Sequence, residues 1–242
     1  MIALWTSLAF AVDGIEVGGG GSTAHTLGES GGTFAAGVFR PWTFAVSERT
    51  DLITTGLVGT FLSPRLDVKH GLVRQDDLAV AFEGGIAVPT PALLLAEGWL
   101  YTSEEPAPFA LIAKAGLRVT GDFDPVRVTG TALLRGGFAT GDLTPRDFFF
   151  VDWALAPAAE GPVLAVLGAQ VDWVPSTRVQ VSLSATTQLG GEGVFELQNR
   201  LFGLWGFSEH VALGAGAFSH LDARPDGYRF YFIPTGDLQV RF

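Results

Sequence analysis

Histidines are the first residues to test for chemistry, because they serve as metal ligands and as general bases. The chain has four, at His25, His70, His210 and His220. They lie far apart, and none has a second ligand at the spacing of a metal site. The sequence therefore predicts no metal and no cofactor.

Acidic pairs and nucleophile motifs are the next candidates for catalysis. The neighbouring acids are Asp76 with Asp77, Glu104 with Glu105, and Asp122 with Asp124, and all fall in expected turns, where solvated carboxylates are ordinary. No Gly-x-Ser-x-Gly sequence occurs, so an acyl-transfer enzyme has no support. We expect a protein that is not an enzyme, with no catalytic residues.

A more informative set consists of charged residues that alternate with apolar ones along the chain. Its members are Glu83, Lys114, Arg118, Arg127, Arg135, Asp152, Asp172, Glu196, Arg200, Arg229 and Arg241. On the inner wall of a β-barrel they would line a pore and set its ion preference. Alternatively, they would form a salt-bridge network that fills a narrow lumen. The sequence leaves both interpretations open.

The element that must position such residues is the β-strand, and the last fifteen residues show it best. From Tyr228 to Phe242 the even positions are apolar or aromatic except at Pro234 and Gly236, while most odd positions are polar. This period of two predicts a strand with one apolar face. Pro234 removes a ladder hydrogen bond, so it predicts either a bulge or a turn before a shorter last strand.

Composition agrees with strands that face lipid. Hydrophobic residues make up 48% of the 242 residues and charged ones 17%, yet no apolar run is long enough for a transmembrane helix. Cysteine is absent, which excludes disulfides and thiolate metal sites. The net charge of -10 argues against nucleic acid as a partner.

The same alternation recurs along the chain and predicts twelve strands in one domain, residues 33–242. Fourteen strands result if a Gly-rich leader and Ala92–Thr102 also count, although Ala92–Thr102 fits a short helix or an interfacial loop equally well. The twelve expected strands are Thr33–Ser47, Leu52–Leu62, Leu66–Leu72, Leu78–Val88, Phe109–Thr120, Val126–Arg135, Asp147–Pro157, Val163–Trp173, Val179–Thr186, Phe195–Phe207, Val211–Ala217 and Tyr228–Phe242, with Asp222–Gly227 as the final loop.

The amino-terminal region lacks the clear strand alternation of the rest of the chain. Residues 1–11 end in Ala9-Phe10-Ala11, a small-x-small pattern that predicts a signal peptide cleaved before Val12 or Asp13. A first strand or a disordered tail are the alternatives. Residues 12–32 include four consecutive glycines and are expected to form a flexible leader.

The strand faces opposite the apolar ones hold small residues and few charges. This composition suits the inside of an antiparallel up-and-down barrel better than the solvent-exposed surface of a soluble β-sandwich. Over nearly its whole length, and most clearly in the terminal Gly236–Phe242, the chain resembles the outer-membrane β-barrel proteins of Gram-negative bacteria. The resemblance implies a bacterial outer-membrane location and the lipid bilayer as partner. It also implies recognition by the barrel-assembly machinery through the last strand ending in Phe242.

From this we expect a small porin or passive channel for ions or small polar solutes. The alternative is a non-conducting structural or interaction barrel, and an outer-membrane hydrolase is the third hypothesis.

Overall fold

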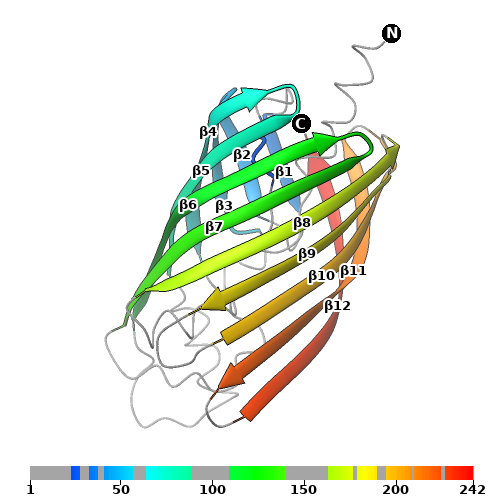
Figure 1. Cartoon of the computed structure of the whole chain (residues 1–242). Coiled ribbons are helices and arrows are strands. Elements are labelled where there is room, and N and C mark those ends of the chain that lie inside the picture. The colour runs from blue at the N-terminus through cyan, green and yellow to red at the C-terminus, as the bar shows by residue number, and fades with distance from the viewer. Residues whose placement is uncertain are drawn as a thin grey trace.

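A computed structural model shows twelve antiparallel strands that close into one barrel (Figure 1). It describes residues 23–27, 33–37, 41–56, 64–88, 109–139, 163–176, 179–189, 195–208, 210–224 and 227–241. The strands are β1 (Phe34–Gly37), β2 (Trp42–Ser47), β3 (Thr50–Thr54), β4 (Arg65–Gln75), β5 (Leu78–Ala87), β6 (Ala110–Phe123), β7 (Val126–Ala139), β8 (Leu164–Ser176), β9 (Val179–Leu189), β10 (Phe195–Gly206), β11 (Val211–Arg224) and β12 (Gly227–Arg241).

Each strand pairs with its neighbours in sequence, and the last strand pairs with the first. β12 closes the barrel on β1 through Ala35↔Arg241, Ala36↔Val240 and Gly37↔Gln239. Closure leaves no free sheet edge at these positions, which is the requirement that hydrocarbon imposes on a strand. The described residues contain no helix that is both long and apolar enough to cross a membrane.

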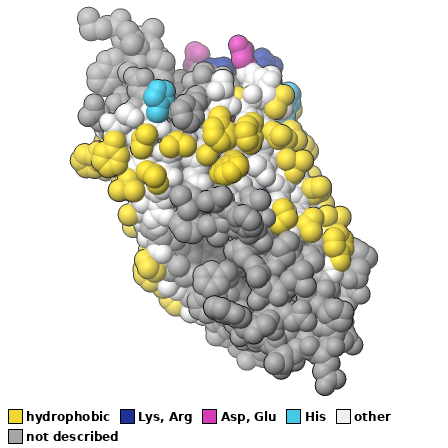
Figure 2. All heavy atoms as spheres, turned by 180° about the vertical axis from the view of Figure 1, so that it is seen from behind, with side chains coloured by type: hydrophobic (Ala, Val, Ile, Leu, Met, Phe, Trp, Pro, Cys, Tyr) yellow, Lys and Arg dark blue, Asp and Glu magenta, His cyan; other side chains and the backbone are white. Residues whose placement is uncertain are grey.

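The outside of the barrel is apolar and the inside is largely polar, because side chains alternate between the two faces. On β10, for example, Leu201 and Trp205 are 54% and 61% exposed, whereas Arg200 between lumen-side neighbours is buried. Figure 2 shows the result on one face, a band of hydrophobic side chains below a rim that carries the charged ones. Such a surface is stable only when lipid covers it.

The two ends of the barrel differ. At one end the connections are short, as at residues 48–49, 76–77, 124–125 and 207–210, and this end also holds the start of β1 and the end of β12. At the other end the connections include 55–64, 88–109 and 140–163. Short periplasmic turns and longer extracellular loops are the rule for outer-membrane barrels, so the short-turn end is the periplasmic one.

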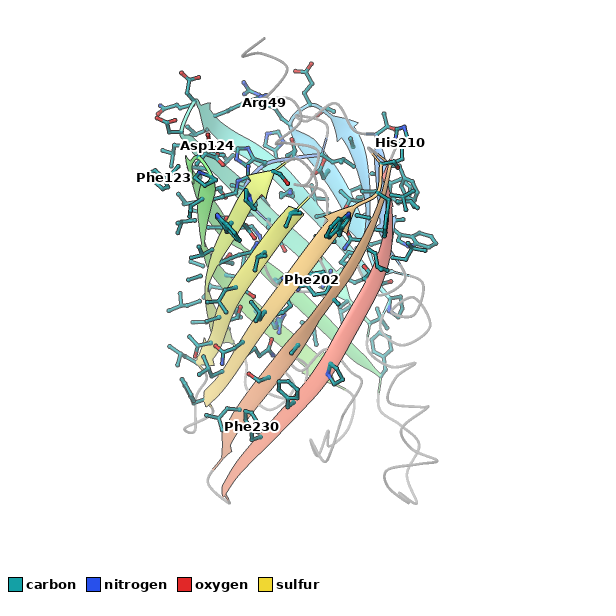
Figure 3. The ribbon with its side chains drawn as sticks, turned by 90° about the vertical axis from the view of Figure 1, so that its right-hand side faces the viewer. Arg49, Phe123, Asp124, Phe202, His210 and Phe230 are labelled. Carbon is teal, nitrogen blue, oxygen red and sulfur yellow. The ribbon has the colours of Figure 1, made fainter. Side chains whose placement is uncertain are left out.

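Aromatic side chains lie near both ends of the apolar band. Phe123 is exposed toward the short-turn end and Phe230 toward the other (Figure 3). Their strand positions place the exposed Trp173 and Trp205 at the short-turn end as well, and Phe195 at the other. From Phe195 to Trp205 the strand rises roughly 33 Å, or about 25 Å along the membrane normal at a tilt of ~40°, which equals the usual apolar band. These rings therefore lie at the levels of the two membrane interfaces.

The wall formed by β1, β2 and β3 is much shorter than the rest. β1 pairs with β12 only at residues 239–241, while β12 continues to Gly227 in register with β11. Within the described residues, β12 has no strand partner on its β1 side from Gly227 to Leu238.

The predicted barrel of twelve strands is confirmed, but two of its strands differ from those expected. The expected strand Thr33–Ser47 is a hairpin, in which Phe34 pairs with Phe44 and Pro41 lies in the connection. The expected strand Asp147–Pro157 lies outside the described residues, as do Ala92–Thr102, residues 1–11 and Phe242. The two differences cancel in the count.

The expected loop Asp222–Gly227 was wrong, because β11 continues to Arg224 and β12 begins at Gly227. The expected turn or bulge at Pro234 was also wrong. β12 passes through Pro234, which pairs with Ala217 in an unbroken register.

Candidate functional site

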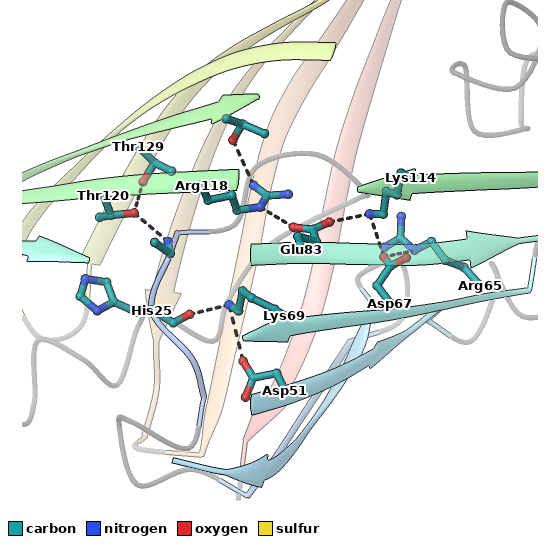
Figure 4. A network of polar contacts seen from close by, with 12 residues as sticks. His25, Asp51, Arg65, Asp67, Lys69, Glu83, Lys114, Arg118, Thr120 and Thr129 are labelled. Carbon is teal, nitrogen blue, oxygen red and sulfur yellow. Dashed lines mark hydrogen bonds and ion pairs between the residues drawn. The ribbon is translucent and has the colours of Figure 1, made fainter. Parts of the chain in front are cut away.

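An ion-paired network on the lumen side of β4, β5 and β6 is the densest polar cluster in the described structure (Figure 4). Glu83 lies between two cations: the Lys114 Nζ atom is 2.5 Å from its Oε1, and the Arg118 Nε atom donates to its Oε2. Lys114 also lies 2.9 Å from Asp67 Oδ2, and the Arg65 Nε atom forms an ion pair with the same oxygen at 3.0 Å. Two carboxylates thus alternate with three cations across neighbouring strands.

Strand register explains why these residues meet. Asp67 and Lys114 lie on either side of Gly85, which pairs with both positions. A Cβ atom at Gly85 would lie 1.9 Å from the Asp67 Oδ1 atom, so this glycine provides the space in which the ion pair forms. Asp67, Glu83 and Arg118 are buried, and the side chains of Arg65 and Lys114 are 12% and 11% exposed. Removing one partner of a buried pair leaves an uncompensated charge that costs about 3–5 kcal/mol.

Residues Thr23–Leu27 occupy the lumen near the short-turn end, where they are buried at 2–6% exposure. The Ala24 amide donates to Thr120 Oγ1 at 2.7 Å, and the Thr26 hydroxyl donates to the Glu48 carbonyl at 2.6 Å. Lys69 donates to the His25 carbonyl. We call Thr23–Leu27 the plug segment, because wall residues on several strands hold it inside the barrel.

Asp51 is the main anchor of the plug segment. Its two carboxylate oxygens accept from the Leu27 amide at 3.0 and 2.8 Å, and Lys69 Nζ lies 3.5 Å away. A carboxylate that is fully buried needs such partners, and here it gets a backbone amide and a cation. The plug segment is therefore bonded to the wall by charge-assisted hydrogen bonds.

The side chain of His25 forms a second anchor. Its Nε2 atom lies 2.8 Å from Asp122 Oδ2, and the other oxygen of Asp122 accepts from Arg127 Nε at 2.6 Å. In the strand register Arg127 lies between Asp122 and Asp172. The histidine is thus linked through one carboxylate to the cations of the wall.

Asp172 centres a further buried cluster on β8 and β9. Gln170 and Gln180 donate to it at 2.8–3.0 Å, and the Ser182 hydroxyl donates at 2.5 Å. Because the serine donates to a carboxylate and not to a histidine, this cluster is not a nucleophile with its base. Its chemistry is that of a satisfied structural carboxylate.

The lumen side of β10 and β11 is apolar instead. Phe202, Leu204 and Ala212 form a buried cluster. The Phe202 ring lies over β11, since a Cβ atom at Gly214 would be 2.3 Å from the ring and one at Gly216 would be 2.6 Å from it. In Figure 3 Phe202 lies midway along the barrel.

The structure brings together some of the charged residues predicted from the sequence. Glu83, Lys114 and Arg118 are in one network, and Arg127 lies beside Asp172 in register. Arg200 is buried on the lumen side of β10, and Arg135 is half-buried opposite Lys114. Asp152 lies outside the described residues. For Glu196, Arg229 and Arg241 only the strand positions are described.

Sequence reasoning missed several residues of the site. Asp51, which lies in β3, was not among the predicted residues, and Asp67 was not chosen although its alternation with Leu66 and Val68 carried the signal. The plug segment was expected to be part of a flexible leader, because it has no strand periodicity. Among the described residues no group of three potential metal-ligating side chains comes together.

Comparison with known proteins gives fold-level likeness alone. No family model matches the chain, and no curated protein does. Among solved structures it is similar to OmpT of Vibrio cholerae, at 7% identity over 84% of this chain, with a TM-score of 0.45. This likeness covers 64% of the length of that OmpT. The chain is also similar to LpxR from Salmonella typhimurium, at 11% identity over 84% of this chain and 87% of that one, with a TM-score of 0.44.

The expectations of a pore and of a protein without enzymatic function do not hold. The prediction of a porin or passive channel is wrong, because the plug segment and the ion pairs occupy the described lumen near the short-turn end. The expectation that the chain is not an enzyme was wrong as an exclusion, because the absence of a nucleophile motif in the sequence does not exclude catalysis by side chains that the fold brings together.

The fold and the location are those of a bacterial outer-membrane β-barrel. The antiparallel pairing satisfies the backbone of the paired strands within lipid, and the apolar outer face between two aromatic levels matches the bilayer.

Proposed function

We propose that this protein is a non-conducting outer-membrane barrel, sealed at its periplasmic end by its own plug segment, that works from the membrane and the extracellular side. The observation that carries the proposal is the burial of Thr23–Leu27 inside the barrel, bonded to β3, β4 and β6. A passive channel needs a continuous wet path, and this segment occupies part of the lumen near the short-turn end.

Energetics support a seal that stays closed. Asp51, Lys69 and Asp122 each hold the segment by a hydrogen bond in which one group is charged. Such bonds contribute about 1.5–3 kcal/mol each, so opening the seal breaks several of them at once. Thermal opening then has a low population.

Conductance in planar bilayers tests the proposal. Correctly folded protein, identified by heat-modifiable migration, is expected to give no regular open-channel steps. The matched variant deletes residues 23–27 and is expected to conduct, because it removes the seal and leaves every strand in place. Steps of equal size and frequency in the wild type and in the deletion variant would overturn the proposal.

The partners proposed here are the lipid bilayer around the apolar band and the barrel-assembly machinery at the last strand. The exposed even face of β12, with Phe230 at 66% and Phe232 at 64% exposure, supports the first. Extraction by detergent alone, and not by salt or alkali, is the expected result for a barrel that spans the membrane. For the second, truncation of Phe242 is expected to lower the folded yield in the membrane.

A further inference from the structure

A pocket lies at the periplasmic rim of the barrel, between the plug segment, the β2–β3 turn and the end of β4. It encloses about 300 Å³ of empty space, part of which is open to solvent. Its lining includes Thr26, Glu48, Arg49, Leu72, Val73 and Arg74. We call it the rim pocket. Two arginines and one glutamate border it beside apolar residues, so its composition suits a ligand with both charged and apolar parts.

Hydrogen bonds fix the backbone around the rim pocket. The Thr26 hydroxyl donates to the Glu48 carbonyl at 2.6 Å, and the Gly71 amide donates to the Arg49 carbonyl at 2.8 Å. The Ser47 hydroxyl accepts from the Arg49 amide at 3.3 Å. The plug segment, the turn and β4 are thus bonded to one another, while Glu48 and Arg49 remain exposed. Their charged side chains therefore extend from a fixed backbone.

A β-bulge at Leu72 brings apolar surface to the edge of the rim pocket. The register of β4 with β5 shifts at this point, so Leu72 keeps the lipid-side parity of β4 and Val73 pairs with the lipid-side Val80. Leu72 and Val73 are 50% and 42% exposed. Arg74 pairs with Ala79, which is a buried lumen-side position. The pocket therefore lies across the rim, with a cation on the lumen side and an apolar pair on the lipid side.

The rim pocket lies at the depth of lipid head groups. Arg49 is nearer the short-turn end than Phe123, one of the aromatic residues at the periplasmic interface (Figure 3). Figure 2 shows both acidic and basic side chains on this rim. Head groups occupy roughly 5–8 Å beyond each side of the hydrocarbon core of a bilayer. The charged residues of the pocket therefore meet the head groups of the periplasmic leaflet.

We infer that the rim pocket binds the head group of a phospholipid of the periplasmic leaflet, and that this head group carries a primary ammonium, as in phosphatidylethanolamine. Arg49 and Arg74 supply donors to the phosphate, because a guanidinium group matches phosphate oxygens. Glu48 accepts from the ammonium, and Leu72 and Val73 contact the acyl chains. The inference goes beyond the sealed barrel proposed above, and lipid binding is measured independently of conductance.

The same charged groups also occur in soluble phosphate compounds, but the surroundings of the rim pocket favour a lipid. The exposed pair Leu72 and Val73 offers apolar contact that only an acyl chain uses. The bilayer also holds head groups at the level of the pocket, which gives them a high effective concentration there. A soluble compound has neither advantage.

Native mass spectrometry of the folded full-length protein in detergent tests the rim pocket. The protein is titrated with phosphatidylethanolamine, phosphatidylcholine or glycerophosphoethanolamine, the soluble head group. Phosphatidylethanolamine is expected to bind at least about tenfold more tightly than phosphatidylcholine, whose methylated ammonium has no N–H donor, and about tenfold more tightly than the soluble head group. Equal affinity for the two lipids overturns the head-group assignment, and equal affinity for the soluble compound overturns the lipid assignment. Absence of binding overturns the whole inference.

Matched variants assign the binding to the rim pocket. Glu48→Gln is expected to bring the affinities for the two lipids to near equality, because it removes the acceptor of the ammonium. Arg49→Gln is expected to weaken both lipids by at least about tenfold, the scale of one charge-assisted hydrogen bond. Asp124→Asn, an exposed acid in another turn at the same end, is expected to change neither. Full discrimination in Glu48→Gln, or unchanged affinity in Arg49→Gln, with heat-modifiable migration intact, overturns the assignment.

Discussion

Replacing Glu83 by glutamine is expected to destabilise the barrel more than any surface change. Glu83 is 2% exposed and pairs with Lys114 and Arg118, so Glu83→Gln keeps the shape and removes the charge that both cations face. Loss of one partner of a buried pair costs about 3–5 kcal/mol. Lys114 keeps Asp67 at 2.9 Å, which places the expected loss near the lower end, at about 3 kcal/mol.

Guanidinium unfolding in lipid vesicles or detergent measures this loss. With an m-value of about 4 kcal/mol/M, a loss of about 3 kcal/mol lowers the midpoint by roughly 0.75 M. The control Asp76→Asn, in an exposed turn, is expected to stay within about 0.5 kcal/mol of the wild type. A midpoint for Glu83→Gln that matches the control would refute the reasoning, because it would mean that Glu83 carries no buried charge balance.

Two further substitutions test the two faces of the wall. Gly214→Ala places a Cβ atom 2.3 Å from the Phe202 ring and is expected to cost about 1–3 kcal/mol, whereas Gly130→Ala, with no atom within 4 Å, is expected to cost much less in the same unfolding assay. Equal costs would contradict the placement of Phe202 in the lumen. Leu201→Arg puts a charge on the lipid side of β10 and is expected to lower the unfolding free energy by about 2–4 kcal/mol, with full stability retained as the contrary result.

The strand faces could be predicted because apolar and polar residues alternate with a period of two along the sequence. The even residues of the last strand, such as Phe230 and Leu238, are exposed on the outside, and Asp237 and Gln239 are buried inside, as the alternation predicts. Pairing between β12 and β1 was expected from closure alone. The same reasoning failed at Thr33–Ser47, because a hairpin with a short connection at Pro41 keeps the alternation on both of its arms.

The candidate site was harder to predict, because its geometry depends on contacts across many strands. Glu83, Lys114 and Arg118 could be chosen by parity, but parity does not reveal that Gly85 leaves room for Asp67 between them. The plug segment has neither strand nor helix periodicity. Its place follows from partners such as Asp51 and Asp122, which lie 24 and 97 residues away in the chain.

The contacts of the plug segment also constrain the order in which the barrel can assemble. Its partners Asp51, Lys69 and Thr120 lie on β3, β4 and β6, in the amino-terminal half of the wall. The first six strands can therefore bind the segment while the sheet is still open, before β12 arrives at β1. In this order of assembly, the plug segment acts as an internal template that sets the curvature of the sheet. A variant without it would have to find its curvature from the strands alone and would close more slowly.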